Sequence, residues 1–462
     1  MYKKIIGLLC IFALFSSNLF IVSTLGLKTT TLISENNDGK WTILVYIDGD
    51  NFIVNKYASD TLNYIEMVEN NTDIRVIVQV DGTRVNDTKR FFMSYDGDMS
   101  SIGSEEIFDW GDGLGNQSRE INMGDPNSLS DFIIWSINNY PSEHYLLSIN
   151  DHGYGWDGLC IDEHSNNSYI TLKELKNAFT RVSQNTNVDK LDVLYFDACD
   201  MGDIEVYYEI KEYVKYGVSS QDGVIADHNK IYQFLLENLS KDPNIEPVDV
   251  ARELADFCFK SYSEVGNHIF KCYNDVSVID LSKIENLAIV IDEFANILID
   301  KLEENASYSK LITQASTDAL RFLQGYSKSF LNIDICQLVR NIKFRSLLDD
   351  EVKEICNDIL DILKNEVIIQ SDSVKHDEMG KAHGLNIYLD YKQENIYDKY
   401  FDLDFADDTN WDEFIVKYLD VKEESENSEK QLVIFKNLFN RFPLLEQLFF
   451  KFIPFNKLKG LR

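Results

Sequence analysis

A histidine and a cysteine stand at equivalent places in two stretches of the sequence. His152 follows the short apolar run 144–149 (HYLLSI), and Cys199 follows the apolar run 191–196 (LDVLYF). Short apolar runs of this kind predict strands buried on both faces of a parallel sheet. A cysteine thiolate is a nucleophile, and a histidine can transfer a proton near neutral pH. The pair therefore predicts nucleophilic catalysis if the fold brings the two side chains together.

The segment between them has the composition of a crossover helix. Residues 171–182 (TLKELKNAFTRV) show helical spacing, and His152 and Cys199 are 47 residues apart. A strand–helix–strand crossover places the carboxyl ends of two parallel strands side by side. A second helix is predicted at 203–212, and a helix N-terminus near Cys199 would stabilise its thiolate. Taken alone, Cys199 could equally be a core residue, since cysteine is among the most buried residue types.

Two motif blocks resemble those of a known family. DHGYGW (151–156) and FDACDMGDIEVYYEI (196–210) resemble the His and Cys blocks of the clostripain-like cysteine peptidases, which share the caspase/gingipain type of fold. Further likeness lies in Asp162–Glu163, in GVSSQD (217–222) and in HGLNIYLDY (383–391). The resemblance covers roughly residues 41–419. It implies an α/β, caspase-like three-layer fold: a mainly parallel sheet flanked by helices, followed by a helical C-terminal region.

The resemblance also implies the roles of the reacting groups. His152 and Cys199 would work as a dyad without a close carboxylate to orient the imidazole. The backbone N–H groups of Gly153 and Cys199 would stabilise the oxyanion, and the missing side chain of Gly153 would let the scissile carbonyl approach. Without the dyad, Gly153 is an ordinary turn glycine after a strand.

Substrate choice is assigned to residues near the cysteine. By resemblance Asp197 forms the acidic base of the S1 pocket and pairs with an Arg or Lys at P1; without the resemblance it is a helix N-cap or turn residue. Asp222 is a second candidate. Ser219 and Ser220 would bind an extended substrate through backbone hydrogen bonds.

Four other histidines are rival bases, but none has a cysteine partner suggested by the predicted topology: His144, His164, His228 and His383.

These residues predict a secreted cysteine endopeptidase that cleaves protein or peptide substrates after Arg or Lys through a covalent acyl-enzyme. The alternatives are a peptidase of the same fold with another P1 preference, and a catalytically silent surface-binding protein that keeps the fold. Two features depart from the family pattern. The loop 157–169, where members are commonly cleaved during maturation, contains no Lys or Arg, and Tyr154 stands where glycine is frequent.

The strongly acidic composition restricts the partners. The 462 residues carry a formal charge of −33, which would repel the phosphates of nucleic acid. The predicted chemistry requires no cofactor, and a dependence on Ca²⁺ is implied by the resemblance only. No EF-hand loop is present, the acidic stretch 109–112 is as readily a solvated turn, and the metal-binding residues are unknown. The seven cysteines have no regular spacing, and Cys258 and Cys272 could pair or stay free.

The chain divides by composition into five segments. Residues 1–26 have the layout of a signal peptide, or of a retained membrane anchor, and predict a secreted or cell-surface protein. Residues 27–40 form a polar leader, 41–280 the catalytic domain, and 281–420 a mostly helical region with a returning strand at 383–391. The tail 421–462 is basic and amphipathic, and it could contact an anionic membrane or the acidic body of its own protein.

Overall fold

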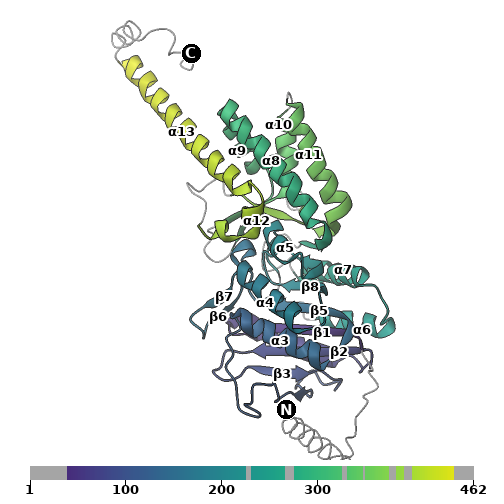
Figure 1. Cartoon of the computed structure of the whole chain (residues 1–462). Helices are drawn as coiled ribbons and strands as arrows, with labels where there is room; N and C mark the ends of the chain where they lie inside the picture. Colours follow the sequence, from purple (N-terminus) through teal and green to yellow (C-terminus); the bar gives the residue numbers. More distant parts are fainter. Residues whose placement is uncertain are drawn as a thin grey trace, which may run out of the picture. The chain divides into compact units, whose positions relative to one another are not determined.

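The computed structural model describes most of the chain from Gly39 to Arg441 (Figure 1). The predicted signal peptide, the leader up to residue 38 and the tail beyond residue 441 lie outside the described residues, whereas Lys40, assigned to the leader from sequence, lies in the first strand. The described residues are 39–224, 230–265, 275–324, 330–346, 349–373, 381–389 and 398–441.

A nine-stranded sheet forms the centre, in the order β13-β10-β9-β8-β5-β1-β2-β3-β4. Its middle strands are mutually parallel, as their apolar sequences predict: β1 (Gly39–Asp48), β2 (Ile74–Asp81), β5 (Ser142–Asn150), β8 (Leu191–Asp197) and β9 (Val214–Ser219). Antiparallel pairings extend both edges, through β3 (Lys89–Phe92) and β4 (Glu105–Glu106) on one side and through β10 (Asp275–Asp280) and β13 (Ile368–Ser373) on the other.

Helices cover both faces of the sheet, which confirms the predicted three-layer α/β fold (Figure 1). Side chains alternate along β1, so that Leu44 and Tyr46 join one buried cluster while Ile43 and Val45 join the other. The first cluster includes α3 (Pro126–Asn139), α4 (Leu172–Asn185) and α5 (Ile204–Ile210). The second includes α2 (Phe52–Glu66), α6 (Lys230–Lys241) and α7 (Pro247–Val265).

The crossover helix α4 begins at a well-formed cap. Thr171 accepts a hydrogen bond from the Glu174 N–H, and the Glu174 carboxylate accepts from the Thr171 N–H. This capping box fixes where the chain turns back toward β8. Between β5 and α4 lie a short 3₁₀ turn, η1 (Gly155–Asp157), and a hairpin of β6 (Leu159–Asp162) and β7 (Ser168–Ile170).

The region after β10 contains helices and a second, three-stranded sheet of β11 (Arg321–Gln324), β12 (Phe330–Asp334) and β14 (Asn386–Tyr388). β14 lies within the predicted strand 383–391, but β11 and β12 fall inside a run predicted to be helical. They are too short for a period of two residues to stand out. The helices and helical turns are η2 (Leu281–Lys283), α8 (Ile284–Glu304), α9 (Ser307–Thr317), α10 (Ile335–Arg345), α11 (Asp350–Ile362), η3 (Leu363–Val367), η4 (Asp398–Asp402), α12 (Asp404–Asp408) and α13 (Trp411–Arg441).

Buried glutamates join the helix after the cysteine to this later region. The Glu205 carboxylate accepts hydrogen bonds from the Tyr388 N–H (2.9 Å) and the Tyr400 hydroxyl (2.7 Å). Glu209 accepts from the Asp404 N–H, and burial raises the pKa of both glutamates to about 7. These hydrogen bonds connect α5, which directly follows the loop that carries Cys199, to the part of the chain after residue 380.

None of the helices in the described ranges combines the length and apolar character needed to cross a bilayer.

Candidate active site

The strand register places the His and Cys loops next to each other. β5 and β8 are parallel neighbours in which Asn150 pairs with Asp197, and His152 and Cys199 each lie two residues beyond that pair. The Asn150 side-chain amide also donates to the Asp197 carboxylate over 2.8 Å. The predicted crossover is thus present, and it brings both loops to the carboxyl edge of the sheet, where open α/β sheets carry their chemistry.

Gly153 lies where these two loops meet. A Cβ atom built on Gly153 would lie 2.1 Å from the carbonyl oxygen of Cys199 and 2.9 Å from the side chain of Met201. Only glycine allows this approach. The hydrogen bonds on either side of it are made by its neighbours, from the Tyr154 N–H to the Gly158 carbonyl (2.8 Å) and from the Cys160 N–H to the His152 carbonyl (3.1 Å).

His152 is only partly exposed. Burial lowers the pKa of its imidazole below the ordinary value of 6.5, and the charge of Glu163 opposes this shift in part. The neutral imidazole, which can accept a proton, is therefore favoured at neutral pH.

Cys199 differs from the other cysteines that the structure describes. Its thiol is partly exposed, whereas those of the four others are buried: Cys160, Cys258, Cys336 and Cys356. Burial raises the pKa of Cys356 to about 12 and that of Cys160 well above its ordinary value, so these thiols stay protonated. The Val224 N–H donates to the Cys199 sulfur over 3.3 Å. The interpretation of Cys199 as a sealed core residue is not supported, and Cys272 lies outside the described residues.

Asp197 lies at the end of β8, just before the cysteine loop. Its side chain is buried and accepts hydrogen bonds from the Asn150 amide (2.8 Å) and the Tyr232 hydroxyl (3.1 Å). Both donors come from neighbouring elements, β5 and α6. The carboxylate is thus held in place by contacts that a helix N-cap would not require.

The loop after β9 contacts the cysteine loop through its main chain. The Asp200 N–H donates to the Asp222 carbonyl (3.0 Å), and the Gly202 N–H donates to the Ser220 carbonyl (2.8 Å). Asp222 is partly exposed, whereas Ser219 and Ser220 are buried. The hydroxyl of Ser219 hydrogen-bonds that of Tyr207 (2.6 Å).

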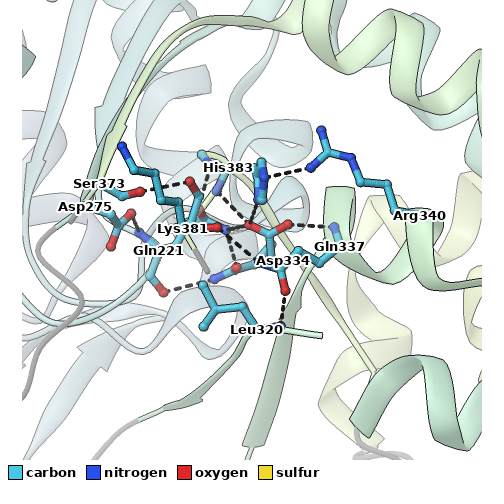
Figure 2. Close-up of polar contacts among 12 residues, drawn as sticks. Gln221, Asp275, Leu320, Asp334, Gln337, Arg340, Ser373, Lys381 and His383 are labelled. Atoms are coloured by element: carbon cyan, nitrogen blue, oxygen red, sulfur yellow. Dashed lines mark hydrogen bonds and ion pairs between the residues drawn. The ribbon is translucent and has the colours of Figure 1, made fainter. Parts of the chain in front are cut away.

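Two residues that the sequence did not single out hold this loop. The Asp275 carboxylate, on β10, accepts from the Ser220 hydroxyl (2.9 Å) and from the Gln221 N–H (2.8 Å). Figure 2 shows Gln221 between Asp275 and a second group, in which Asp334 accepts from the Gln221 amide (3.3 Å) and from the His383 N–H (2.7 Å). Burial raises the pKa of Asp275 to about 7. These contacts join residues at least 49 positions apart, which no local pattern reveals.

The rival histidines pair with other groups. The His144 ring contacts the Trp41 ring in a tilted arrangement and lies 3.4 Å from Asp192, and His383 lies 3.3 Å from Asp334. His164 contacts Asp50 (3.0 Å), and His228 lies outside the described residues.

Five buried aspartates gather beside the His loop. Asp48 and Asp81 are register partners at the ends of β1 and β2, and Asp151 follows Asn150, the partner of Ile47. Burial raises the pKa of Asp48 and Asp151 well above the ordinary value, and that of Asp81 to about 8. The cluster is completed by Asp50 and Asp162. Sequence analysis did not identify this cluster, because its members come from separate strand ends. The acidic stretch 109–112 is not part of it and is largely exposed, as expected of a turn.

A three-layer fold with a histidine and a cysteine at neighbouring strand ends is the layout of the caspase-like cysteine peptidases. The sequence profile of the Clostripain family matches residues 45–420, well over half of the chain. The protein belongs to the clostripain family and is a cysteine-type endopeptidase, a hydrolase.

Individual relatives are distant. The chain is 23% identical to clostripain of Hathewaya histolytica in an alignment 417 positions long that covers 78% of this chain and 77% of clostripain. Two solved structures share the fold. One is a secreted C11 cysteine protease of Bacteroides thetaiotaomicron in complex with an irreversible peptide inhibitor (TM-score 0.57, 18% identity, 81% of this chain and 100% of that one). The other is an inactive zymogen C11 protease of Parabacteroides distasonis (TM-score 0.58, 17% identity, 80% and 98%).

Proposed function

We propose that this endopeptidase cleaves peptide bonds after Arg or Lys through a dyad of Cys199 and His152. The observation that carries the proposal is the matched register of β5 and β8, which sets both residues two positions beyond one paired position. Cys199 is also the partly exposed thiol among the described cysteines, and the lowered pKa of His152 favours a neutral base on the neighbouring loop.

The reaction follows from these groups. His152 takes the proton of the Cys199 thiol, and the sulfur attacks the scissile carbonyl carbon. The backbone N–H groups of Gly153 and Cys199 stabilise the oxyanion. His152 then gives its proton to the departing amine, which leaves an acyl-enzyme thioester. Water, deprotonated by His152, hydrolyses the thioester and restores the thiol.

Specificity is assigned to the acidic residues around the thiol. The buried Asp197 precedes the nucleophile by two positions, and its carboxylate would pair with a guanidinium or ammonium at P1. Asp222 is the second candidate. Because the Ser219 hydroxyl is engaged with Tyr207 and the Ser220 hydroxyl with Asp275, these serines would bind substrate through their main chain.

The dyad is tested with an irreversible thiol-directed peptide probe that carries Arg at P1. We expect one labelled site, at Cys199, and no labelling of Cys199→Ala. Peptide turnover by that variant should fall on the order of 10⁴-fold or more. Cys336→Ala is the matched control, because it removes a buried thiol and should retain turnover. Equal labelling of wild type and Cys199→Ala would rule out the assignment.

Export is proposed from residues 1–26. If they form a cleaved signal peptide, N-terminal sequencing of the mature protein from its native host should begin after Gly26 or further along the leader. An intact Met1 on a membrane-bound protein would instead assign the segment to an anchor. The tail, residues 421–462, is proposed to contact an anionic membrane or the acidic body of the protein.

A further inference from the structure

A tyrosine on α6 contacts the carboxylate to which substrate choice is assigned. The Tyr232 hydroxyl donates to Asp197 Oδ2 over 3.1 Å, although 35 positions separate the two residues. Tyr232 is 3% exposed and belongs to the buried cluster that includes α2, α6 and α7. The proton transfers between His152 and the thiol involve no group of α6, so this contact must serve another purpose.

The same oxygen accepts a second hydrogen bond. The Asn150 side-chain amide donates to Asp197 Oδ2 over 2.8 Å, and Asn150 is the register partner of Asp197 on β5. An ionised carboxylate has about four acceptor positions, two on each oxygen. Two donors therefore fill Oδ2, and at most one oxygen of Asp197 has acceptor positions left for a P1 side chain.

Ser148 orients the tyrosine hydroxyl. The hydroxyl oxygens of Ser148 and Tyr232 lie 2.8 Å apart, and both side chains are buried. A phenol has a single proton to donate. Because the proton of Tyr232 is directed to Asp197, Ser148 must donate to Tyr232, and the hydrogen bonds run in one chain toward the carboxylate. Burial, together with the charge of Asp197, raises the pKa of Tyr232 well above its ordinary value of 10, so the hydroxyl remains a donor.

The network lies on one face of the sheet. Ser148 and Asn150 are two positions apart on β5, so their side chains point to the same face, and their register partners on β8 are Tyr195 and Asp197. The Tyr195 hydroxyl is also buried there, but it contacts the Cys258 sulfur (3.4 Å). This face therefore holds two buried tyrosines, of which Tyr232 donates to the carboxylate.

The two basic side chains differ in what they need from a carboxylate. A guanidinium is planar, and it pairs strongly through two parallel N–H···O bonds, one to each oxygen. At Asp197 it would have to displace Asn150 or Tyr232 from Oδ2, which would leave a buried donor without an acceptor, at a cost. A lysine ammonium is a compact charge that one carboxylate oxygen satisfies, with its other donors directed elsewhere.

We propose that Tyr232, oriented by Ser148, determines specificity by occupying Asp197 Oδ2, so that the enzyme prefers Lys to Arg at P1. The inference rests on the proposed role of Asp197 in the S1 pocket, and it narrows the substrate class from basic residues to lysine. Tyr232 is a positioning residue, because it acts on the substrate through the Asp197 carboxylate.

The test compares kcat/KM for two fluorogenic peptides that differ only in Lys or Arg at P1. For the full-length wild type we expect a Lys-to-Arg ratio of about ten. In Tyr232→Phe the ring stays and the donor is lost, so Oδ2 regains an acceptor position for the guanidinium. The ratio should fall about fivefold, mainly through a lower KM for the Arg peptide.

Tyr195→Phe is the matched control. It removes a buried hydroxyl from the same face of the sheet and should keep the wild-type ratio. Thermal melting shows that both variants are folded. A wild type that prefers Arg, a wild-type ratio in Tyr232→Phe, or an equal fall in Tyr195→Phe would each overturn the assignment.

Asp197→Asn separates this inference from the proposed function. If that variant keeps the wild-type preference for basic over neutral P1 residues, the role of Asp197 fails, and the role of Tyr232 fails with it. If Asp197→Asn loses the preference but Tyr232→Phe keeps the wild-type Lys-to-Arg ratio, only the role of Tyr232 fails.

Discussion

Gly153 is the residue at which the two halves of the proposed active site contact each other. In Gly153→Ala the added Cβ would meet the Cys199 carbonyl at 2.1 Å, so the two loops must separate. A shift of about 1 Å between reacting groups can lower the rate on the order of 100-fold. We expect kcat/KM to fall by about that factor, measured with a fluorogenic peptide.

A suitable control for this substitution is Gly113→Ala. Gly113 has a positive φ (+78°), unlike Gly153, and nothing lies within 4 Å of the added atom. It should lose about 1 kcal/mol of stability and retain kcat/KM. Equal kcat/KM in both variants would show that the contact between the loops is not needed.

Asp197 carries the prediction about specificity. If its buried carboxylate pairs with a basic P1 side chain, Asp197→Asn loses an interaction on the order of 2–5 kcal/mol. The kcat/KM for a P1 Arg substrate should therefore fall by about 30-fold or more, while substrates with neutral P1 residues change little. A P1 peptide library measures the ratio.

Asp192→Asn is matched to this variant, since it alters a buried aspartate of the same strand at its opposite end. Its P1 preference should equal that of the wild type. If Asp197→Asn keeps the wild-type ratio of kcat/KM for P1 Arg to kcat/KM for P1 Ala, Asp222 becomes the candidate for the residue that pairs with P1.

At the scale of elements, β10 fixes the loop after β9 through Asp275. The pKa of Asp275 is raised by burial, from 3.8 in the unfolded chain to about 7, with the charge of Asp222 adding to the rise. Between these values the folded protein keeps a proton that the unfolded chain has lost. Stability from this group is therefore greatest near pH 4 and is lost as the pH rises toward 7.

Asp275→Asn should remove this slope, because an amide can still accept from the Gln221 N–H and donate to the Ser220 hydroxyl. We compare the unfolding free energy of the wild type with that of the variant. From pH 4 to pH 7, the wild-type value should decrease relative to the variant value by up to about 4 kcal/mol. Urea denaturation at several pH values measures it. If the unfolding free energies of the two proteins change with pH in parallel, Asp275 does not hold this proton in the folded protein.

The elements that sequence reasoning recovers are those defined by local pattern. The apolar runs before His152 and Cys199 became β5 and β8, and the helical spacing of 171–182 became α4. The short strands β11 and β12 were missed. So were Gln221 and Asp275, whose roles depend on contacts between distant segments. The aspartate cluster was missed for the same reason, as its members share a place only once three strands lie side by side.

At the scale of the whole molecule, the region after residue 280 completes the central sheet. β13 pairs with β10, and Tyr388 and Tyr400 both donate to one carboxylate oxygen of the buried Glu205, on the helix that follows the cysteine loop. A fragment ending at Asp280 would expose β10 as an edge and leave Glu205 buried without these partners.

We therefore expect the fragment 39–280 to lack a cooperative thermal transition by circular dichroism, whereas the full chain shows one. A sharp transition of the fragment within a few degrees of the full chain would establish the segment as an independent domain.

The shared register of β5 and β8 also bears on how this family can change in length. Deleting or inserting one residue within either strand would turn the side chains beyond the change to the opposite face of the sheet. It would also move His152 and Cys199 out of their matched positions. The turn at residues 163–167, between β6 and β7, lies outside both strands, so a change in its length would leave their register unaltered.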